Sequence, residues 1–374
     1  MAALSSRRSS DESLHAATTP LHTFCPGPRL IAMTDPHAPA LVVVFNLGSG
    51  HGPADQVRRV LEAGCAAVGR PLQLLEVPDP RELVSIARRA VAQARECGGV
   101  VVAAGGDGTI NTVAQATLGS GCAFGVLPQG TFNYFGRANG IPEDTAAALQ
   151  VLLDGHRQPA QVGRVNGKVF LVNASLGLYP TLLEDREKWK QQFGRSRLVA
   201  FGAGLATLLR GHRSLRLRVE AQGVERELRT ATVFVGNNAL QLQQLGFEEA
   251  DAVNDGRLAA IALRPVGRLT MLGLLLRGAL GRLGEADQVL HLATRRLTVH
   301  AGRRLGVLGA RRMKVATDGE VQWMQLPITF EVAKEPLDLL RPAPVPAAAT
   351  QGVAAPLSLI AGGNGRPGPA MSDS

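Results

Sequence analysis

Short apolar runs and amphipathic stretches alternate along the first part of the chain. Short, mostly apolar runs predict strands, and these runs occupy residues 41–45, 72–77, 99–104 and 123–127. Apolar residues at helical spacing predict helices between the strands, over residues 56–68, 82–96, 110–116 and 144–153. This alternation is typical of a doubly wound, mostly parallel sheet, which binds its ligands at the carboxyl ends of the strands.

Beyond residue 157 the pattern changes, because strand-like segments follow one another with few helical stretches between them. The predicted strands cover residues 169–174, 214–221, 231–235, 258–263, 313–316 and 328–332. We therefore expect an α/β domain over residues 40–157 and an antiparallel, β-rich second domain over residues 158–342. The flanking residues 1–39 and 343–374 are polar or rich in Pro, Ala and Gly, and are predicted to be disordered.

The chain of 374 residues carries a formal net charge of +9. Such an excess of positive charge favours an anionic partner, either a nucleic acid or an acidic membrane surface. Aromatic residues make up only 4% of the chain and do not interleave with basic residues as base stacking requires, so nucleic acid is disfavoured. No apolar run reaches the roughly 18 residues of a spanning helix, which predicts peripheral contact with an anionic membrane.

Four cysteines are scattered along the chain and form no Cys-x-x-Cys pair. They are Cys25, Cys65, Cys97 and Cys122. This spacing signals neither a zinc site nor a disulfide framework. The N-terminal residues also lack the apolar core of a signal peptide. A reduced, cytoplasmic setting is therefore expected.

The most informative turn is Gly105-Gly106-Asp107-Gly108-Thr109, which joins a predicted buried strand to a predicted helix. Its glycines let the backbone turn sharply and approach a ligand closely. Free N–H groups at the start of the helix favour a phosphate there. A carboxylate repels phosphate, so Asp107 is expected to handle Mg²⁺ or a hydroxyl proton. The alternative is a tight turn in which Asp107 only caps the helix.

Two more polar turns follow predicted strands at the same edge of the sheet. Asn46, Ser49 and Gly50 belong to the turn after the first strand, and Gly130-Thr131 follows the fourth. These residues offer amide, hydroxyl and bare backbone groups, which suit nucleotide phosphates. Each turn alone is also an ordinary turn, but three of them at three strand ends predict a shared nucleotide cleft.

Asp-Gly pairs at Asp255-Gly256 and Asp318-Gly319 each predict a two-residue type I′ hairpin turn. Glu320 directly follows the second pair, where a hairpin can project its carboxylate into a cleft between two domains. The chain lacks the P-loop, protein-kinase, serine-hydrolase and zinc-protease motifs, so the sequence gives no support to these classes.

Taken in order, these motifs resemble those of the diacylglycerol kinase catalytic-domain family, which includes bacterial lipid kinases and sphingosine kinases. The resemblance runs from about residue 41 to residue 340. It implies two domains with ATP in the cleft between them, and transfer of the γ-phosphate to a hydroxyl of a diacylglycerol- or sphingoid-type lipid. The implied nucleotide contacts are Asn46, Ser49, Gly50, Gly105, Gly106, Asp107, Gly108, Thr109, Asn111 and Thr131.

The resemblance also implies catalytic roles for three acidic residues. Glu320 would accept the proton of the lipid hydroxyl, with Asp107 and Asp318 nearby. The chain departs from the usual residues of the bacterial lipid kinases at Thr112 and Tyr134. It also has Leu47 where proline is usual, and residues 76–81 lack the threonine-glycine nucleotide contact of the family. The three acidic residues of the implied chemistry are present.

Asp255, helped by the carbonyl groups of Ala252 and Arg257, matches by this resemblance a Mg²⁺ site of bacterial lipid kinases. Residues 268–283 mix arginines with leucines, as does a helix that lies on a membrane surface. A core helix of the second domain is the alternative for this segment. The oligomeric state is open, with a homodimer among the options.

Two other functions stay open. One is an NAD kinase-like enzyme with a soluble substrate, against which the Asp318-Gly319-Glu320 and Gly130-Thr131 motifs argue. The other is a catalytically silent protein that binds a nucleotide or a lipid. The presence of Asp107, Asp318 and Glu320 argues against this second alternative.

Overall fold

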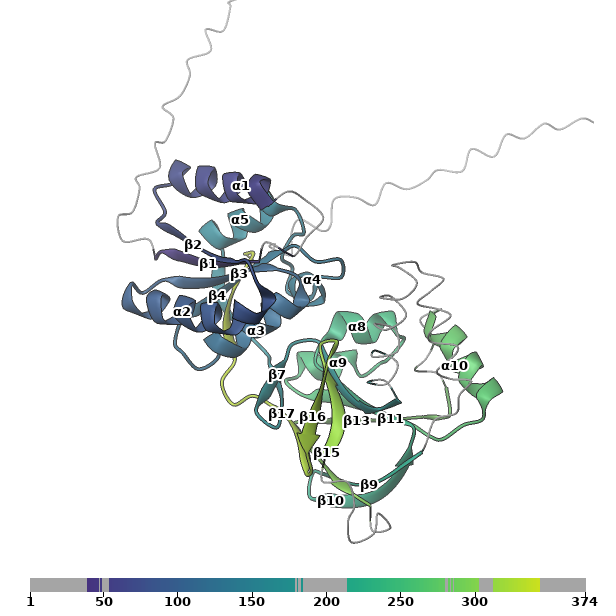
Figure 1. Cartoon of the computed structure of the whole chain (residues 1–374). Helices are drawn as coiled ribbons and strands as arrows, with labels where there is room; N and C mark the ends of the chain where they lie inside the picture. The colour runs from purple at the N-terminus through teal and green to yellow at the C-terminus, as the bar shows by residue number, and fades with distance from the viewer. Residues whose placement is uncertain are drawn as a thin grey trace, which may run out of the picture.

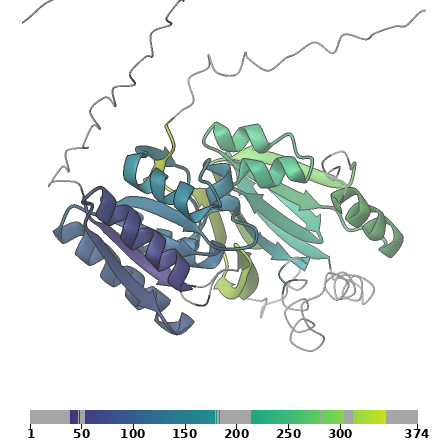
Figure 2. The ribbon, with the colours of Figure 1, turned by 90° about the horizontal axis from the view of Figure 1, so that it is seen from above.

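The structure, a computed structural model, describes residues 39–46, 48, 54–178, 180, 183, 214–279, 282, 284, 286–302 and 312–343. This part of the chain forms an α/β domain and a β-rich domain that lie side by side (Figure 1 and Figure 2). The two segments predicted to be disordered fall, apart from residues 39 and 343, outside the described residues.

One mostly parallel sheet organises the α/β domain, in the strand order β2-β1-β3-β4-β18-β5. The neighbours among β2, β1, β3 and β4 run parallel, while β18 pairs parallel to β4 and antiparallel to β5. The strands are β1 (Leu41–Asn46), β2 (Leu72–Val77), β3 (Val100–Gly105), β4 (Ala123–Pro128), β5 (His156–Ala160) and β18 (Leu337–Arg341).

Helices cover both faces of this sheet. On one face α1 lies beside α5, and on the other α2 lies beside α3 (Figure 1). The helices are α1 (Ala54–Ala67), α2 (Leu83–Glu96), α3 (Asp107–Thr117), α4 (Tyr134–Ala138) and α5 (Thr145–Asp154), with a 3-10 turn η1 (Pro80–Glu82) before α2. The loops at the carboxyl ends of the strands therefore lead directly into helix N-termini, as predicted.

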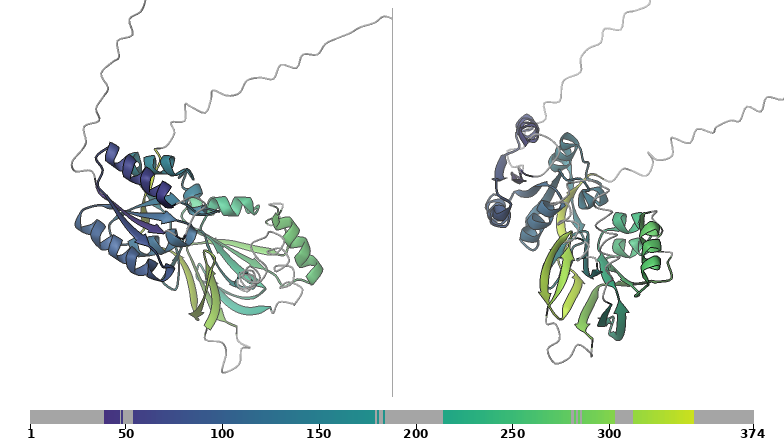
Figure 3. Two further views of the ribbon diagram at one scale, coloured as in Figure 1. Left: turned by 45° about the horizontal axis from the view of Figure 1, so that its top comes forward. Right: turned by 45° about the vertical axis from the view of Figure 1, so that its right-hand side comes forward.

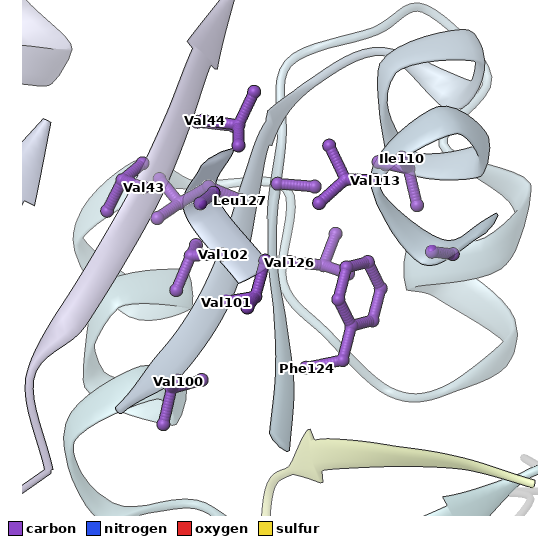
Figure 4. Packing of buried hydrophobic residues seen from close by; sticks show 14 of the residues in the cluster. Val43, Val44, Val100, Val101, Val102, Ile110, Val113, Phe124, Val126 and Leu127 are labelled. Carbon is purple, nitrogen blue, oxygen red and sulfur yellow. The ribbon is translucent and has the colours of Figure 1, made fainter. Parts of the chain in front are cut away.

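The central strands β1, β3 and β4 are buried almost throughout because helices cover both sides of the sheet. Val43, Val102 and Val126 belong to the same buried cluster as Ile110 and Val113 of α3 (Figure 4). Burying one such side chain contributes about 1.5–3 kcal/mol. This core fixes the strand ends at which the predicted turns lie.

Two antiparallel sheets form the β-rich domain, in the orders β10-β9-β14-β17-β6-β7 and β13-β12-β11-β8-β15-β16. Both sheets contribute to one core, as Phe170 and Phe330 of the first and Leu176 and Val315 of the second show. The strands are β6 (Gly163–Val165), β7 (Lys168–Phe170), β8 (Asn173–Gly177), β9 (Leu215–Ala221), β10 (Val224–Thr230), β11 (Thr232–Gly236), β12 (Leu258–Leu263), β13 (Val289–Thr294), β14 (Arg296–Ala301), β15 (Arg312–Thr317), β16 (Glu320–Gln325) and β17 (Ile328–Val332). The predicted fold class is confirmed.

The chain crosses between the domains twice. The first crossing follows β5, and the second leads from β17 back to β18 in the sheet of the α/β domain. The N–H of Ala333 donates to the carbonyl of Val162 at 2.8 Å, so the two crossings are joined to each other. The pattern of apolar residues did not predict this return of the chain to the first sheet.

The predicted strand over residues 169–174 is wrong in one respect, because it is interrupted between β7 and β8. At the interruption, the N–H groups of Leu171, Val172 and Asn173 donate to the carboxylate of Asp318. These donors are therefore paired with a side chain of another hairpin.

The predicted hairpin turn at Asp255-Gly256 is also wrong, because Asp255 follows the last residue of helix α9 (Ala250–Asn254). Gly256 has a φ of +75°, and the N–H of Arg257 donates back to the carbonyl of Ala252 at 2.9 Å. This is a helix-ending motif, in which a glycine with positive φ satisfies the last carbonyl groups.

The predicted hairpin turn at Asp318-Gly319 is confirmed. Asp318 and Gly319 have φ values of +46° and +92°, and Thr317 pairs with Glu320 across the turn. Positive φ at both central residues is the signature of a type I′ turn. The turn connects β15 to β16 and places Glu320 at the first position of β16.

Two short helices, α8 (Ala239–Gln244) and α9, accompany the second domain together with α10 (Arg268–Ala279). Helix α10 lies at the end of this domain that is remote from the α/β domain (Figure 1 and Figure 3). Its residues Met271 and Leu274 are buried, whereas Leu269 is 86% exposed. One side of the helix thus packs as a core helix does and another remains open. No helix in the described ranges has the length and apolarity needed to cross a membrane.

Candidate functional site

The polar turns predicted from the sequence meet at the carboxyl ends of β1, β3 and β4. The Nδ2 of Asn46 donates to the Oγ1 of Thr109 at 2.8 Å, which joins the first turn to the second. A Cβ on Gly130 would lie 2.9 Å from the Cα of Gly106, so the second and third turns touch through their backbones. This confirms the prediction that the turns lie close together.

A cavity of about 530 Å³ opens beside these turns, and we call it the loop cavity. Its size falls within the usual range for small-molecule sites. Both domains contribute side chains to its lining, which includes Asn46, Gly106, Gly108, Thr109, Lys168 and Glu320. The loop cavity is therefore a cleft between the domains, as the sequence predicts for the nucleotide.

Glu320 reaches the loop cavity from the start of β16. Its Oε2 lies 3.0 Å from the Nζ of Lys168, and its side chain is 62% exposed. A Cβ on Gly108 would lie 3.9 Å from its Oε1, so the carboxylate stands next to the glycine-rich turn. An exposed ion pair contributes only about 0–1 kcal/mol, so either partner can exchange the other for a ligand at little cost.

Lys168 was missed in the sequence analysis, although a signal for it exists. It follows Asn166-Gly167, whose φ values of +45° and +85° make a second type I′ turn. An Asn-Gly pair between apolar runs predicts this turn, just as Asp318-Gly319 predicts the turn before Glu320. Two hairpins thus each present the residue after the turn to the loop cavity.

Asp318 does not line the loop cavity, and its carboxylate is enclosed by donors. Its Oδ2 accepts from the N–H of Leu171 at 2.7 Å and from the Nδ2 of Asn111 at 2.6 Å. Its Oδ1 accepts from the N–H groups of Val172 and Asn173, both at 2.9 Å. Burial raises the pKa of Asp318, and the four N–H donors oppose the rise. Both oxygens are therefore occupied by the protein itself.

Asn111 connects the two domains at the same place. Besides its bond to Asp318, its Nδ2 donates to the carbonyl of Val169 at 3.2 Å, and its side chain is buried. Helix α3 is thereby attached to β7 and to the hairpin that carries Glu320. This geometry gives Asn111 a positioning role in addition to its place in the lining of the loop cavity.

Asp107 is the first residue of α3, with its carboxylate directed at the start of α4. The backbone N–H groups of Asn133, Tyr134 and Phe135 lower its pKa, but burial outweighs them and raises the pKa. Its Oδ1 is buried and has no hydrogen-bond partner among the described residues. Asp107 therefore connects the second turn to the residues that follow the third turn. A direct role of Asp107 in turnover stays a prediction.

The raised pKa of Asp107 predicts a pH dependence of stability. Between the ordinary Asp pKa of about 3.9 and the raised value, the folded state binds more protons than the unfolded state. The free energy of unfolding should consequently fall as the pH rises through this window, by at most about 1.4 kcal/mol per pH unit. Asp107→Asn should make that fall smaller, because it removes the contribution of Asp107 and leaves that of Asp318, whose pKa is also raised. Denaturant unfolding of both proteins across the acidic range measures the difference, and identical pH profiles would contradict the prediction.

The remaining predicted nucleotide contacts are less central. Ser49 and Gly50 lie outside the described residues. The N–H of Gly48 donates to the Oδ1 of Asn46 at 3.1 Å, which orders the start of the first turn. Thr131 is exposed and is not part of the lining of the loop cavity.

The residues predicted to bind Mg²⁺ lie at the end of α9, away from the loop cavity. The carboxylate of Asp255 is 2.9 Å from the Nη2 of Arg257. The carbonyl of Arg257 accepts from the Nε2 of Gln161 at 3.1 Å, and that of Ala252 closes the helix. Oxygen ligands suit Mg²⁺, and the ion pair of Asp255 with Arg257 is exposed and contributes little, so the Mg²⁺ site stays a prediction. Among the described His, Cys, Asp and Glu residues no group of three or more could hold a metal ion.

Two family models match the chain. The diacylglycerol kinase catalytic domain matches residues 40–165, and the YegS C-terminal NAD kinase beta sandwich-like domain matches residues 187–341. The chain is 44% identical over 98 residues to the "Probable lipid kinase YegS-like" protein of Klebsiella pneumoniae (strain 342), which is 25% of this chain and 33% of that protein. It is 28% identical over 248 residues to the diacylglycerol kinase of Staphylococcus aureus (strain bovine RF122 / ET3-1), which is 65% of this chain and 74% of that protein.

The match to the YegS-like relatives is partial, since it spans about a third of the length of the Klebsiella protein. A crystal structure of a diacylglycerol kinase from Bacillus anthracis str. Sterne aligns over 83% of this chain and 98% of that one. Its TM-score is 0.60 at 18% identity, which shows a shared two-domain fold. Residues 40–165 thus match the diacylglycerol kinase catalytic domain, and residues 187–341 match the C-terminal domain of YegS-like lipid kinases.

Proposed function

We propose that this chain is an ATP-dependent lipid kinase, which transfers the γ-phosphate of ATP to a hydroxyl group of a lipid. The observation that carries the proposal is the loop cavity, where the glycine-rich turn and the carboxylate of Glu320 face each other across the domains. Phosphoryl transfer asks mainly for positioning and for stabilisation of charge. The loop cavity offers groups for positioning the substrates and for stabilising the charge.

The turn around Gly106 supports the binding of the ATP phosphates. Gly106 precedes α3, and no side chain caps this helix. Its first N–H groups are therefore free to bind an anion, which the positive end of the helix dipole also favours. Lys168 supplies a positive charge on the opposite side of the loop cavity. In the proposed complex Lys168 leaves Glu320 and binds the γ-phosphate.

The position of the Glu320 carboxylate in the loop cavity supports its role as the general base. In the proposed reaction the lipid hydroxyl oxygen attacks the γ-phosphorus, its proton passes to the carboxylate of Glu320, and the bond to the ADP oxygen breaks. Mg²⁺ bound to the ATP phosphates would neutralise part of their charge. Asp318 and Asn111 position Glu320, because they attach its hairpin to the segment between β7 and β8 and to α3.

Contact with an anionic membrane is part of the same proposal. The net charge of +9 and the exposed Leu269 on α10 support it. A cytoplasmic location and a homodimer stay predictions from the sequence.

The proposed activity is tested with the purified full chain, radiolabelled ATP and Mg²⁺. Mixed micelles containing diacylglycerol, a sphingoid base or an undecaprenol-type alcohol are offered in parallel with NAD. We expect label in at least one lipid and none in NAD. Label in NAD alone would favour the NAD kinase-like alternative. Binding of ATP without transfer to any acceptor would favour a silent binding protein.

A further inference from the structure

A second cavity, of about 460 Å³, lies where the two crossings between the domains meet, and we call it the crossover cavity. Residues of α4, of both crossings and of the loops around α8 and α9 line it. It shares no described lining residue with the loop cavity. Its volume falls within the range for sites that bind small molecules.

Two arginines, Arg295 and Arg341, line the crossover cavity, and none of the described lining residues is Asp or Glu. The Nη2 of Arg341 donates to the Oδ1 of Asn139, while its Nε is buried without a partner. Burial lowers the pKa of Arg341, and no acidic group offsets this effect. The carbonyl of Arg295 accepts from the N–H of Val332 at 3.0 Å, but its guanidinium forms no ion pair or hydrogen bond within the described part of the chain. The cavity thus carries positive charge that the protein does not compensate.

Side-chain amides make the rest of the polar wall. The Nε2 of Gln161 donates to the Oδ1 of Asn237 at 2.8 Å, and the Nδ2 of Asn237 donates to the carbonyl of Leu171 at 3.1 Å. The Nδ2 of Asn238 donates to the carbonyl of Tyr134 at 3.0 Å. These bonds fix the wall, so a ligand meets a preformed polar surface beside the two guanidinium groups.

We propose that the crossover cavity binds a phosphate group, free or on a small organic molecule, through Arg295 and Arg341. The guanidinium fork matches the oxygens of a phosphate, and such charge-assisted hydrogen bonds are stronger than those between neutral groups. Arg341 lines the cavity, and its buried, unpartnered Nε shows that the protein leaves this guanidinium incompletely satisfied. This site is separate from the kinase chemistry, which needs only the loop cavity.

The crossover cavity is connected to the loop cavity through Leu171. Leu171 lines the crossover cavity, and its N–H donates to the Oδ2 of Asp318, which also binds Asn111 of the loop cavity. A ligand between Arg295 and Arg341 therefore bridges the two domains next to the contact that positions Glu320. We expect it to raise the midpoint temperature of unfolding, because it binds only the folded state.

The test is isothermal titration of the full chain with glycerol 3-phosphate and, separately, with inorganic phosphate. A non-hydrolysable ATP analogue is present throughout, so that the loop cavity is occupied. We expect saturable binding of at least one probe, and a dissociation constant about tenfold or more higher in Arg295→Gln and in Arg341→Gln. Tighter binding of glycerol 3-phosphate identifies an esterified ligand, and equal binding identifies free phosphate.

Arg296→Gln is the matched control, because Arg296 is the next residue but pairs with Glu331 at 3.8 Å and does not line the cavity. Its binding should match that of the unmodified protein. Arg295 is exposed, so its substitution is expected to leave the fold intact. The proposal can therefore be tested with Arg295→Gln if Arg341→Gln does not fold. Absence of binding at millimolar probe, or equal weakening by Arg295→Gln and Arg296→Gln, overturns the proposal.

Discussion

Replacing Glu320 by glutamine is expected to lower kcat for lipid phosphorylation by about 10²–10⁴-fold, the usual contribution of a general base. Glutamine keeps the size of the side chain but does not accept the hydroxyl proton. ATP affinity should change little, because the turns around Asn46 and Gly106 carry the phosphate contacts. The midpoint temperature of unfolding should also stay close to that of the unmodified protein, since the ion pair with Lys168 is exposed.

A matched control for this variant is Glu331→Gln, which removes a carboxylate of similar exposure that pairs with Arg296 outside the loop cavity. Its kcat should be unchanged. If Glu320→Gln folds and keeps full turnover, Glu320 is not the base, and the proposed mechanism is wrong. If it fails to fold, the residue serves the hairpin instead of the reaction.

The first sheet could be predicted from the sequence because its strands are local features. The apolar runs that predict β1, β2, β3 and β4 agree with the observed strands to within one residue at either end. Each run is bounded by polar or glycine-rich turns. Both faces of β1, β3 and β4 are buried, so no polar alternation blurs their pattern, whereas the edge strand β2 includes Gln73 and Glu76. The turns at the strand ends follow directly from these boundaries.

Strand β18 could not be predicted in the same way. Its place in the first sheet depends on pairing with β4 and β5, which are remote in sequence. The Asp255-Gly256 pair was misassigned for a different reason. A glycine with positive φ suits both a type I′ turn and the end of a helix, so the dipeptide alone does not distinguish the two. The helix that precedes it decides the outcome.

In the candidate site, too, local motifs could be predicted from the sequence, whereas contacts between residues remote in sequence could not. The first two polar turns and Glu320 are local motifs, and the structure brings them to one cavity, with the third turn packed against the second. The environment of Asp318 is not local, because its donor at Leu171 lies 147 residues earlier in the chain. From the sequence alone, Asp318 lies within the turn and Glu320 directly after it, but nothing local shows that one carboxylate is buried and the other exposed. Their surroundings make one a buried anchor and the other an exposed group that is available to a substrate.

Replacing Asp318 by asparagine is expected to lower the free energy of unfolding by about 3 kcal/mol or more. Asparagine adopts a positive φ readily, so the turn itself is preserved. Its amide has a single acceptor oxygen, so donors among Leu171, Val172, Asn173 and Asn111 are left without a partner or face an NH₂ group. Because these contacts position Glu320, kcat should also fall, by up to about 10²-fold. Chemical denaturation and steady-state kinetics measure the two effects.

Asp338→Asn is the matched control, since Asp338 is exposed and 3.5 Å from Arg157. Its cost should be only about 0–1 kcal/mol. The relation between stability and turnover in Asp318→Asn then decides the role of this carboxylate. A positioning residue loses both together, and ATP affinity survives because the turns of the α/β domain are untouched. A loss of kcat at unchanged stability would instead place Asp318 in the chemistry. Unchanged stability and turnover would show that its four hydrogen bonds neither stabilise the fold nor position Glu320.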